Sequence, residues 1–582
     1  MPAEEQRPDR DALLQASRRA DWRFLLPDPA LARVACVGVT DRAMLESLRL
    51  LGAVPAITEP GTVGDAAGWH PERPTESGYD LVIATGPSTE TLGRAAALVR
   101  PGGRLYAELP GPSRRTPWPL GAGPRRAVLA AVRALGLDEI QAYWHWPDFA
   151  SCTEIVPLGD PGVLRLALRR RGLGPLARPA GFVARLLGAT WLAALLPHVS
   201  LLARRSSPGA AGDGTGPRPV GNAVLAFLAT HRTRLELARH GLGDELSFVL
   251  VTPRFRASRH VVFLVAGRRD DRPRLVVKVP RLPDDGAGIA REAAALEALQ
   301  GARPEGYATA PRVVALERLA DRALLVETAL VGRPLDPATV RREPSRTLES
   351  VLAWLTELPR SDGDATASGW YERLLGVPLQ RFAAAFPDGG EEAGLVARTV
   401  ELVAPLREAA FPLVFEHGDL SHPNLLRLPG GEVGVVDWEL AEPRGLPAHD
   451  LFFFLAYVAF ARRAARTTQE QRAAVREAFH GPGAWAAPSV RRYAERIGLE
   501  PSLVGPLQVA CWARYATGLL DRLLGEADGV APGPVAVTKL GPETAAWLRA
   551  NRYHAIWRDA VAHAGDADRA LPLRGRSAGR VR

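Results

Sequence analysis

The segment at residues 414–440 constrains the fold of this chain more than any other. It reads VFEHGDLSHPNLLRLPGGEVGVVDWEL, in which the turn sequence PGGE separates two strand-like runs, LLRL and VGVVDW. Such a turn between β-type runs predicts a hairpin. The hairpin would carry Asp437, at the end of its second strand, back beside Asn424, which directly precedes the first strand. Hard oxygen ligands in such an arrangement suit Mg²⁺.

Asp419 follows His417 and Gly418 and lies five residues before Asn424. This H-x-D-x-x-x-x-N spacing is found in the catalytic loop of kinases. Phosphoryl transfer needs a carboxylate to orient the attacking hydroxyl, Mg²⁺ to neutralise the phosphates and a lysine to hold them. The spacing therefore makes Asp419 the candidate catalytic base, and it makes Asn424 and Asp437 the candidate metal ligands.

The motif HGDLSHPN followed by VVDWE resembles the signature of the aminoglycoside phosphotransferase and choline kinase superfamily. The resemblance implies an α+β bilobal domain of protein-kinase-like fold, which uses Mg²⁺ and ATP to phosphorylate a hydroxyl group of a small molecule. It also implies that Trp438 and Glu439 take the place of Phe and Gly in protein kinases. By the same resemblance, Asp450 is a structural carboxylate of the following helix.

The chain has only two lysines, Lys278 and Lys539, because arginine takes nearly all other cationic positions. Lys278 lies in the strand-like run RLVVKVP. A compact ammonium on a phosphate is not replaced by a guanidinium without cost, which explains a lysine kept at this position. The resemblance implies that Lys278 contacts the α and β phosphates, with Glu292 as its partner in preference to Glu297.

Further nucleotide contacts are implied by two other segments. The run ALLVETALVGRPL resembles the hinge that meets the adenine. The loop TPRFRASR contains no glycine, although a glycine-rich phosphate loop is expected there, so Ser258 or nearby backbone amides would cover the phosphates. This departure leaves the choice between ATP and GTP open. The residues expected to line the hinge are Glu327, Thr328, Ala329 and Leu330.

The order of predicted elements changes along the chain. Strand and helix patterns alternate in residues 1–205, which predicts a doubly wound, Rossmann-like α/β domain with a parallel sheet. Residues 206–220, SSPGAAGDGTGPRPV, lack bulky apolar side chains and predict a flexible linker. Residues 221–565 begin with strands and continue mainly with helices, as the kinase-like domain requires. A basic tail follows at residues 566–582.

Residues 79–111 resemble the second half of a class I methyltransferase, in which the turn RPGG leads into a strand. S-adenosylmethionine binding in that family uses a glycine-rich turn after the first strand, because the backbone must approach the ligand closely. Here the turn is VGVTDRA, with Gly38 alone. Glu59, after the strand-like run VPAIT, could still meet a ribose, and Asp80 lies before the later strand. We expect a retained scaffold without methyl transfer and assign no S-adenosylmethionine site.

Several classes of protein are disfavoured by the composition. The three cysteines, Cys36, Cys152 and Cys511, are far apart, so neither a disulfide framework nor a zinc site is indicated, and reduced thiols in a cytoplasmic protein are expected. The net charge is +9, but the arginines are scattered, so no specific nucleic-acid partner is expected. The apolar run at residues 186–203 is interrupted by Pro197, which favours a helical hairpin or interface segment without membrane association.

Two rival functions fit the same sequence. One is a pseudokinase that binds a nucleotide or a partner, which the glycine-free loop favours. The other is a methyltransferase whose kinase-like domain recognises the substrate. The hydroxyl acceptor of the kinase hypothesis cannot be read from the sequence, because residues 345–410 show no distinctive cluster.

Overall fold

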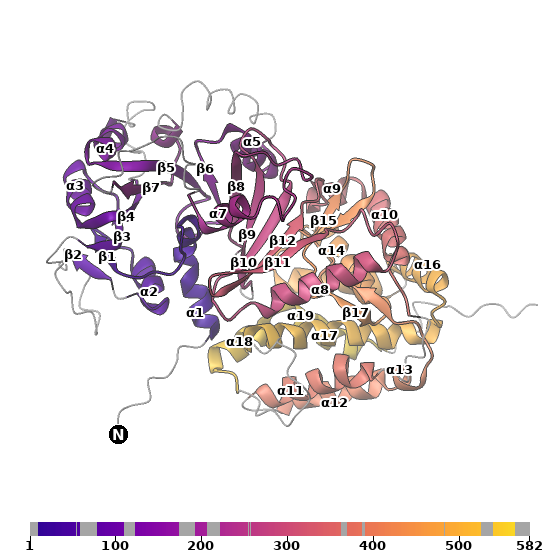
Figure 1. Ribbon diagram of the computed structural model, residues 1–582. Helices are drawn as coiled ribbons and strands as arrows, with labels where there is room; N and C mark the ends of the chain where they lie inside the picture. The colour runs from indigo at the N-terminus through magenta and orange to yellow at the C-terminus, as the bar shows by residue number, and fades with distance from the viewer. Residues whose placement is uncertain are drawn as a thin grey trace, which may run out of the picture. The chain divides into compact units, whose positions relative to one another are not determined.

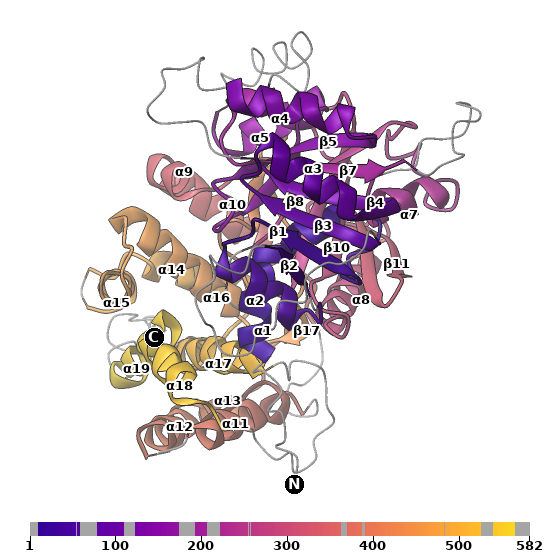
Figure 2. The same cartoon turned by 90° about the vertical axis from the view of Figure 1, so that its left-hand side faces the viewer.

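The computed structural model describes residues 10–53, 55–58, 78–109, 123–173, 192–206, 221–253, 255, 258–361, 369–386, 390–481, 483–524 and 539–564. Two compact units make up the chain. The first comprises Met1–Gly286 and Val314–Ala329, and the second comprises Ala287–Val313 and Leu330–Arg582. Figures 1 and 2 show the chain in two views at right angles.

The first unit is built on a 12-stranded sheet with the strand order β11-β12-β10-β9-β8-β6-β5-β7-β4-β3-β1-β2 (Figure 1). The strands are β1 (Val34–Val37), β2 (Ala56–Thr58), β3 (Tyr79–Thr85), β4 (Val99–Glu108), β5 (Leu137–Trp146), β6 (Glu154–Pro157), β7 (Val199–Arg205), β8 (Leu246–Val251), β9 (His260–Gly267), β10 (Leu275–Pro280), β11 (Val313–Leu319) and β12 (Arg322–Thr328). The accompanying helices are α1 (Arg10–Ser17), the 3₁₀-helix η1 (Arg18–Leu25), α2 (Arg42–Leu50), α3 (Thr89–Leu98), α4 (Gly123–Ala134), α5 (Pro161–Arg170) and α7 (Ala223–Thr230).

Strands β1 to β4 form the parallel part of this sheet. Helices α2 and α3 lie in the connections between these strands, which confirms the predicted alternation of strand and helix. Helix α2 begins after Asp41, whose Oδ1 accepts a hydrogen bond from the Ala43 amide at 3.0 Å. Its apolar face is buried in the core of the first unit through Met44, Leu45 and Leu48. This part is consistent with an α/β domain, and its Rossmann-like character remains a prediction.

Strand β7 corrects one expectation from the sequence. Residues 186–203 were expected to form a helical hairpin or interface segment, but Val199–Arg205 is a strand that pairs antiparallel with both β4 and β5. Short apolar runs do not distinguish a buried strand from a helix by periodicity, which explains the error. Residues 174–191 lie outside the described part. No helix in the described part is long and apolar enough to span a bilayer.

Strand β6 joins the sequence that precedes the predicted linker to the sequence that follows it. It pairs antiparallel with β8, so that Glu154 lies opposite Val251 and Ile155 lies opposite Leu250. One apolar core takes buried side chains from both sides of the linker, including Trp22, Ile83, Tyr143, Phe248, Val277 and Val326. Residues 207–220 lie outside the described part, and the proposed domain boundaries remain a prediction.

The second unit is mainly helical. Its small sheets have the orders β13-β15-β16 and β14-β17. Their strands are β13 (Arg333–Pro334), β14 (Val414–Glu416), β15 (Leu425–Arg427), β16 (Val433–Val435) and β17 (Glu442–Gly445). The helices are α8 (Ala287–Gly301), α9 (Pro337–Arg342), α10 (Pro344–Glu357), the π-helix η5 (Glu372–Gly376), α11 (Val377–Ala385), α12 (Gly390–Val403), α13 (Pro405–Glu408), α14 (His449–Arg463), α15 (Thr468–Phe479), α16 (Ala487–Ile497), the 3₁₀-helix η6 (Pro501–Leu503), α17 (Val504–Leu524), α18 (Pro542–Ala550) and α19 (Arg552–Ala562).

In the second unit, helix α17 packs on both α14 and α19. Helix α14 contains the apolar run LFFFLAYVAF, most of which is buried, as expected of a helix surrounded by others. The rings of Phe453 and Tyr515 stack with their centroids 4.0 Å apart, which joins α14 to α17. Tyr553 lies against Tyr515 at 5.6 Å and extends this aromatic contact to α19.

Asp559 of α19 forms ion pairs with two arginines of α15. A substitution of Asp559 therefore tests how much this contact between the two helices contributes to stability. Its Oδ1 lies 2.6 Å from Nη2 of Arg472 and 2.7 Å from Nη2 of Arg476. Burial disfavours the charged carboxylate, but the hydrogen bonds from the two arginines prevail and hold the pKa of Asp559 below its ordinary value. We expect Asp559→Asn to lower the free energy of unfolding by about 1–2 kcal/mol at neutral pH, measured by urea denaturation.

The pH dependence of that difference has a definite sign. Because the pKa of Asp559 is lowered in the folded state, its stabilisation is present above the ordinary carboxyl pKa of about 4 and is lost as the pH falls through the folded value. The difference between wild type and Asp559→Asn should therefore shrink in acid. A difference that stays constant from neutral pH to about pH 3 would contradict the role of the ionised carboxylate.

Candidate functional site

The segment that contains Asp419 is held by a buried carboxylate of helix α14. The amide nitrogens of His417 and Gly418 donate to the two carboxylate oxygens of Asp450, at 2.6 and 2.8 Å. Gly418 has φ of +84°, and a Cβ there would lie 2.3 Å from the carbonyl oxygen of Leu440. Only glycine fits this position without strain. The backbone just before Asp419 therefore has one well-defined path.

Asn424 bonds directly to the candidate catalytic base. Its Nδ2 donates to the backbone oxygen of Asp419 at 3.0 Å and to Oδ2 of the same residue at 3.1 Å. The hydroxyl of Ser421 donates to the other carboxylate oxygen at 3.2 Å. Because the amide nitrogen of Asn424 is used in this way, its Oδ1 is the atom that could bind a cation. The structure thus brings Asp419 and Asn424 together.

The hairpin β15–β16 returns the chain to the same place. Leu425 pairs with Val435, and the Val436 amide donates to the backbone oxygen of Asn424 at 3.0 Å. Asp437 follows with φ of +71°, in the left-handed region that a residue with a Cβ seldom adopts. Such backbone strain concentrates at ligand and catalytic sites. A second carboxylate, that of Glu439, has an oxygen within 4.8 Å of one of Asp437.

A ligand role for Glu439 was not predicted from the sequence. The only signal was a second carboxylate two residues after Asp437. Together with the amide oxygen of Asn424, the two carboxylates form a set of hard oxygen donors. This donor set fits Mg²⁺ chemically.

Glu292 reaches the same loop from helix α8. It is completely buried, and its Oε1 accepts a hydrogen bond from the Trp438 amide at 2.8 Å. The indole Nε1 of Trp438 donates to the Val435 backbone oxygen at 3.1 Å. Glu292 therefore fixes the residue that follows Asp437. Its predicted pairing with Lys278 remains a prediction.

The ionisation of Asp419 reflects several groups of the second unit. Burial raises the pKa of Asp419 above its ordinary value, the Arg522 guanidinium opposes the rise, and the Asp437 carboxylate adds to it. Arg552 also lowers the pKa, by a smaller amount. A raised pKa brings a carboxylate closer to the range in which it accepts protons effectively at neutral pH.

A buried ion pair lies just before the loop. Glu416 is completely buried, and its Oε1 lies 2.6 Å from Nη1 of Arg514 in α17. The same oxygen accepts a hydrogen bond from the Leu446 amide. Burial raises the pKa of Glu416 even though Arg514 opposes the shift. Burial, with the Glu416 charge adding to it, also raises the pKa of Asp450 to about 7.

The remaining nucleotide candidates lie mostly in the first unit. Lys278 is buried in β10, opposite Val262 of β9 and Leu325 of β12. A buried ammonium requires a counter-charge or an anionic ligand. Glu327 and Thr328 are the last two residues of strand β12. The amide of Ala329, the next residue, donates a hydrogen bond to the backbone oxygen of Arg274. The chain returns to the second unit at Leu330.

Ser258 is held by the buried Arg281. The guanidinium Nη1 donates to the backbone oxygen of Ser258 at 2.8 Å, and it lies 3.4 Å from the hydroxyl. Nε of Arg281 is 3.1 Å from a carboxylate oxygen of Asp21, which ties the segment to η1. Residues 254, 256 and 257 of the predicted phosphate loop lie outside the described part.

An ion-pair network lies at the carboxyl edge of the parallel strands, where ligands of doubly wound folds bind. Arg19 of η1 forms two hydrogen bonds with Glu108 at the end of β4, at 2.7 and 2.8 Å, and one with Asp41 at 2.7 Å. The ring of Trp22 stacks on Tyr106 at 3.8 Å. Among the described residues of this edge, Arg19, Asp41 and Glu108 are thus paired with one another.

Two other residues of the methyltransferase hypothesis, Asp80 and Gly38, have contacts within the protein. Asp80 forms an ion pair with Arg100 and accepts a hydrogen bond from the Arg33 amide, so it stabilises the β3 region. Gly38 has φ of +64°, and its backbone oxygen accepts a hydrogen bond from Thr85. Glu59 lies outside the described residues. The expectation of a scaffold without methyl transfer remains a prediction.

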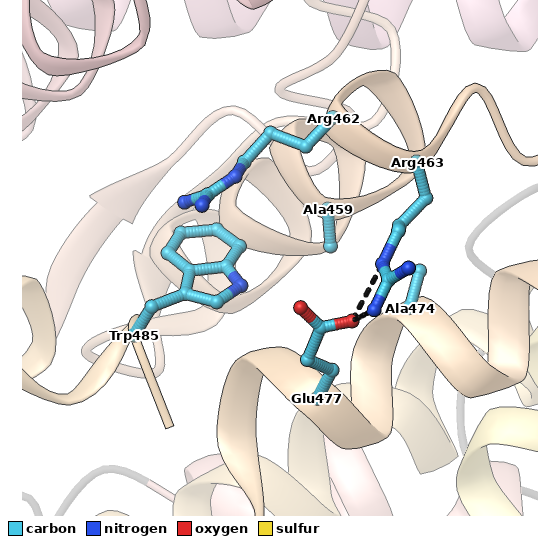
Figure 3. A pocket seen from close by; sticks show the side chains of 6 residues that line it. All are labelled: Ala459, Arg462, Arg463, Ala474, Glu477 and Trp485. Carbon is cyan, nitrogen blue, oxygen red and sulfur yellow. Dashed lines mark hydrogen bonds and ion pairs between the residues drawn. The ribbon is translucent and has the colours of Figure 1, made fainter. Parts of the chain in front are cut away.

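A small polar cavity of about 190 Å³ lies between α14 and α15 (Figure 3). Arg462 lies over the ring of Trp485 at 4.5 Å, and Arg463 forms an ion pair with Glu477. Its lining includes none of the predicted site residues.

Residues 254–488 match the model of the phosphotransferase enzyme family. This stretch contains every candidate of the kinase site, from Ser258 to Asp437. Among curated proteins, none matches the chain.

Several solved kinases resemble the chain at low scores. Choline kinase LicA from Streptococcus pneumoniae is 12% identical, with 57% of this chain and 97% of that chain covered and a TM-score of 0.35. The aminoglycoside phosphotransferase APH(3'')-Id from Streptomyces rimosus, solved with ADP and streptomycin, is 22% identical, with 50% and 98% covered and a TM-score of 0.31. An ethanolamine kinase from Plasmodium vivax is 12% identical, with 54% and 83% covered and a TM-score of 0.34. At these scores the likeness decides neither fold nor substrate.

Proposed function

We propose that this protein is a small-molecule kinase, which transfers the γ-phosphoryl group of ATP to a hydroxyl group with the help of Mg²⁺. The arrangement of Asp419, Asn424 and Asp437 carries this proposal. Asn424 donates its amide hydrogens to Asp419, while its backbone oxygen holds the turn that leads to Asp437. The family match at residues 254–488 supports the same reaction class.

Asp419 is the proposed catalytic base. The acceptor hydroxyl oxygen forms a bond to the γ-phosphorus, the bond from that phosphorus to the β–γ bridging oxygen breaks, and ADP leaves. The hydroxyl proton passes to the Asp419 carboxylate and then to solvent. The hydrogen bonds from Asn424 and Ser421 keep this carboxylate oriented. Orientation and a proton acceptor are what a kinase loop must supply.

Asn424 and Asp437 would hold Mg²⁺, with Glu439 as a further oxygen donor. The ion, when bound, would neutralise the negative charge of the phosphates. Glu292 keeps the Asp437–Trp438 backbone in place through its hydrogen bond to the Trp438 amide. This contact lies within two residues of both carboxylates, so it restricts the positions that they can take.

For the nucleotide, we propose that Lys278 contacts the phosphates and that Ser258 lies over them. The hinge residues that would meet the base are Glu327, Thr328, Ala329 and Leu330. The preference between ATP and GTP is measured by comparing the thermal stabilisation that each nucleotide gives.

Thermal stabilisation by Mg-ATP tests the nucleotide site directly. At one hundred times its dissociation constant, a ligand stabilises a protein by about 2.7 kcal/mol. We expect wild type to melt at a higher temperature with Mg-ATP or Mg-GTP, and Asp437→Ala to lose most of this gain. Asp244→Ala is the matched control, because Asp244 is an exposed carboxylate of the first unit. No stabilisation of wild type by either nucleotide would overturn the proposal.

The two rival functions give different outcomes. A pseudokinase would be stabilised by nucleotide but would release no ADP with any acceptor. A methyltransferase would be stabilised by S-adenosylmethionine, although Arg19 already forms ion pairs at the strand edge where this ligand would bind. Both ligands are therefore included in the same experiment.

A further inference from the structure

The β8–β9 connection, residues 252–259, is held by arginine side chains. A glycine-rich phosphate loop lets its backbone approach the ligand closely, with its amides directed at the phosphates. The β8–β9 connection has no glycine, so its backbone depends on neighbouring groups for its path. The structure describes five of its residues, which are Thr252, Pro253, Phe255, Ser258 and Arg259. Pro253, Phe255 and Ser258 each accept a hydrogen bond from a guanidinium group at the backbone oxygen.

Arg281 joins the two ends of the β8–β9 connection. It is completely buried, its Nη2 donates to the Pro253 backbone oxygen at 3.0 Å, and its Nη1 donates to the Ser258 backbone oxygen at 2.8 Å. Its amide donates to the backbone oxygen of Arg259 at 2.8 Å. Arg281 directly follows β10 and comes three residues after Lys278. It therefore fixes the connection relative to the strand that carries the candidate phosphate-binding lysine.

Helix η1 holds the same connection. Nη2 of Arg18 donates to the Phe255 backbone oxygen. Both carboxylate oxygens of Asp21 accept from Nε of Arg281, at 3.2 and 3.1 Å, and Nη2 of Arg23 donates to the Arg281 backbone oxygen at 2.7 Å. All eight residues of η1 are buried. The helix thus contacts the connection directly through Arg18 and indirectly through Arg281.

The buried charges of this cluster are costly for the fold. Arg23 and Arg281 are almost completely buried, and both lie within ion-pair distance of Asp21. Burial lowers the pKa of Arg23 to about 10, Asp21 opposes this shift, and Arg322 and Arg281 add to it. Apolar residues in place of buried ion pairs often leave a protein as stable or more stable. Perturbed pKa values concentrate at functional sites, which agrees with a role for the cluster at the neighbouring connection.

We propose that Arg18 and Arg281 are positioning residues of the nucleotide site, which hold the β8–β9 connection where Ser258 and the backbone amides meet the phosphates. The inference rests on the proposed kinase function, and it names the groups that take over the part of glycine in a glycine-rich loop. Helix η1 lies outside residues 254–488, which the family model matches. A helix beyond the matched segment thus determines how tightly the phosphates are bound.

The test uses the full chain and ligands that share a base but differ in their phosphates. Thermal stabilisation over a range of concentrations gives dissociation constants for adenosine, Mg-ADP and Mg-ATP, with the guanosine series in parallel. We expect Arg281→Lys and Arg18→Gln to weaken binding of the preferred triphosphate by about tenfold or more, because each removes hydrogen bonds from a charged donor. Binding of the corresponding nucleoside should be unchanged, since the connection contacts only the phosphates. A general defect of the fold does not produce a loss confined to phosphate-bearing ligands.

The two variants test separate contacts. Arg281→Lys keeps the positive charge, but an ammonium cannot reach both backbone oxygens as the guanidinium fork does. Arg18→Gln leaves Arg281 in place, so it decides the question if Arg281→Lys fails to fold. The matched control is Arg104→Lys, the same exchange at a partly buried arginine of β4 that lies 3.4 Å from Glu139. It should leave the affinities for nucleoside and triphosphate unchanged.

Each outcome decides between the two proposals. If neither Mg-ATP nor Mg-GTP stabilises wild type, the kinase function fails, and the positioning role of Arg18 and Arg281 fails with it. If a nucleotide stabilises wild type, the positioning role alone is overturned by either of two results. These are an unchanged affinity for the triphosphate in the folded variants, and an equal loss of affinity for nucleoside and triphosphate.

Discussion

Asp419→Asn should lower the rate of phosphoryl transfer by about a hundredfold or more, because it removes the proton acceptor while preserving the shape of the side chain. The measurement is ADP release in the presence of Mg-ATP, with a panel of small hydroxyl compounds as acceptors and with water as the basal acceptor. The Asn side chain fills the same space, so Mg-ATP should still stabilise the variant. A separation of binding from turnover is the expected signature of a catalytic group.

The control for this change is Asp244→Asn, an exposed carboxylate that is paired with Arg232 in the first unit. It should keep the full rate. If Asp419→Asn stays within about threefold of wild type, Asp419 is not the base. If Asp419→Asn instead abolishes stabilisation by Mg-ATP, the carboxylate acts on the nucleotide or its metal. Asp419 would then be the metal ligand and Asp437 the candidate base.

The local arrangement around Asp419 could be predicted because short-range rules determine it. The turn PGGE between two strand-like runs predicted the hairpin β15–β16, and the hairpin explains why Val436 bonds to the backbone of Asn424. The rarity of lysine marked Lys278 without any knowledge of its neighbours. Sequence spacing was enough to predict a contact wherever both residues lie within one hairpin or one loop.

Long-range contacts could not be predicted in the same way. The hydrogen bond between Glu292 and the Trp438 amide joins α8 to a residue 146 positions away, and no pattern in the sequence indicated it. Arg522 and Arg552 come from helices whose sequence patterns show amphipathicity but not the direction of each face. The effect of these two charges on Asp419 depends on how α14, α17 and α19 pack, and a single sequence does not contain that information.

The sheet of the first unit was only partly predictable for a related reason. The parallel strands β1 to β4 alternate with helices, and this periodicity is visible in the sequence. Strand β7 was missed because a short buried strand has no alternation of polar and apolar residues. The pairing of β6 with β8 was also missed, since the composition of residues 206–220 predicts a linker but does not predict which strands on its two sides pair.

Arg514→Met should lower the free energy of unfolding by about 3–5 kcal/mol, because it leaves the carboxylate of Glu416 buried without its cation. Glu416 is completely buried, and one of its oxygens receives both Arg514 and the Leu446 amide, while the other has no hydrogen-bond partner in the described residues. Urea denaturation of wild type and variant at neutral pH measures the difference. A loss below about 1 kcal/mol would show that the pair contributes little to stability.

Two further measurements identify the cause of that loss. Burial already raises the pKa of Glu416, and removal of Arg514 should raise it further, so the unpaired carboxylate destabilises the folded state most at neutral pH. Because the folded pKa is raised, the variant should regain stability as the pH falls below neutral and Glu416 takes up a proton. The double variant Glu416→Gln/Arg514→Met should also recover most of the loss at neutral pH, since it removes the buried charge. If the double variant is no more stable than Arg514→Met, the loss comes from packing of the arginine stem in α17 rather than from the charge.

The backbone of His417 and Gly418 follows Glu416 directly, so this ion pair could also help to position Asp419. The rate of phosphoryl transfer in the double variant, compared with that of wild type, measures this contribution.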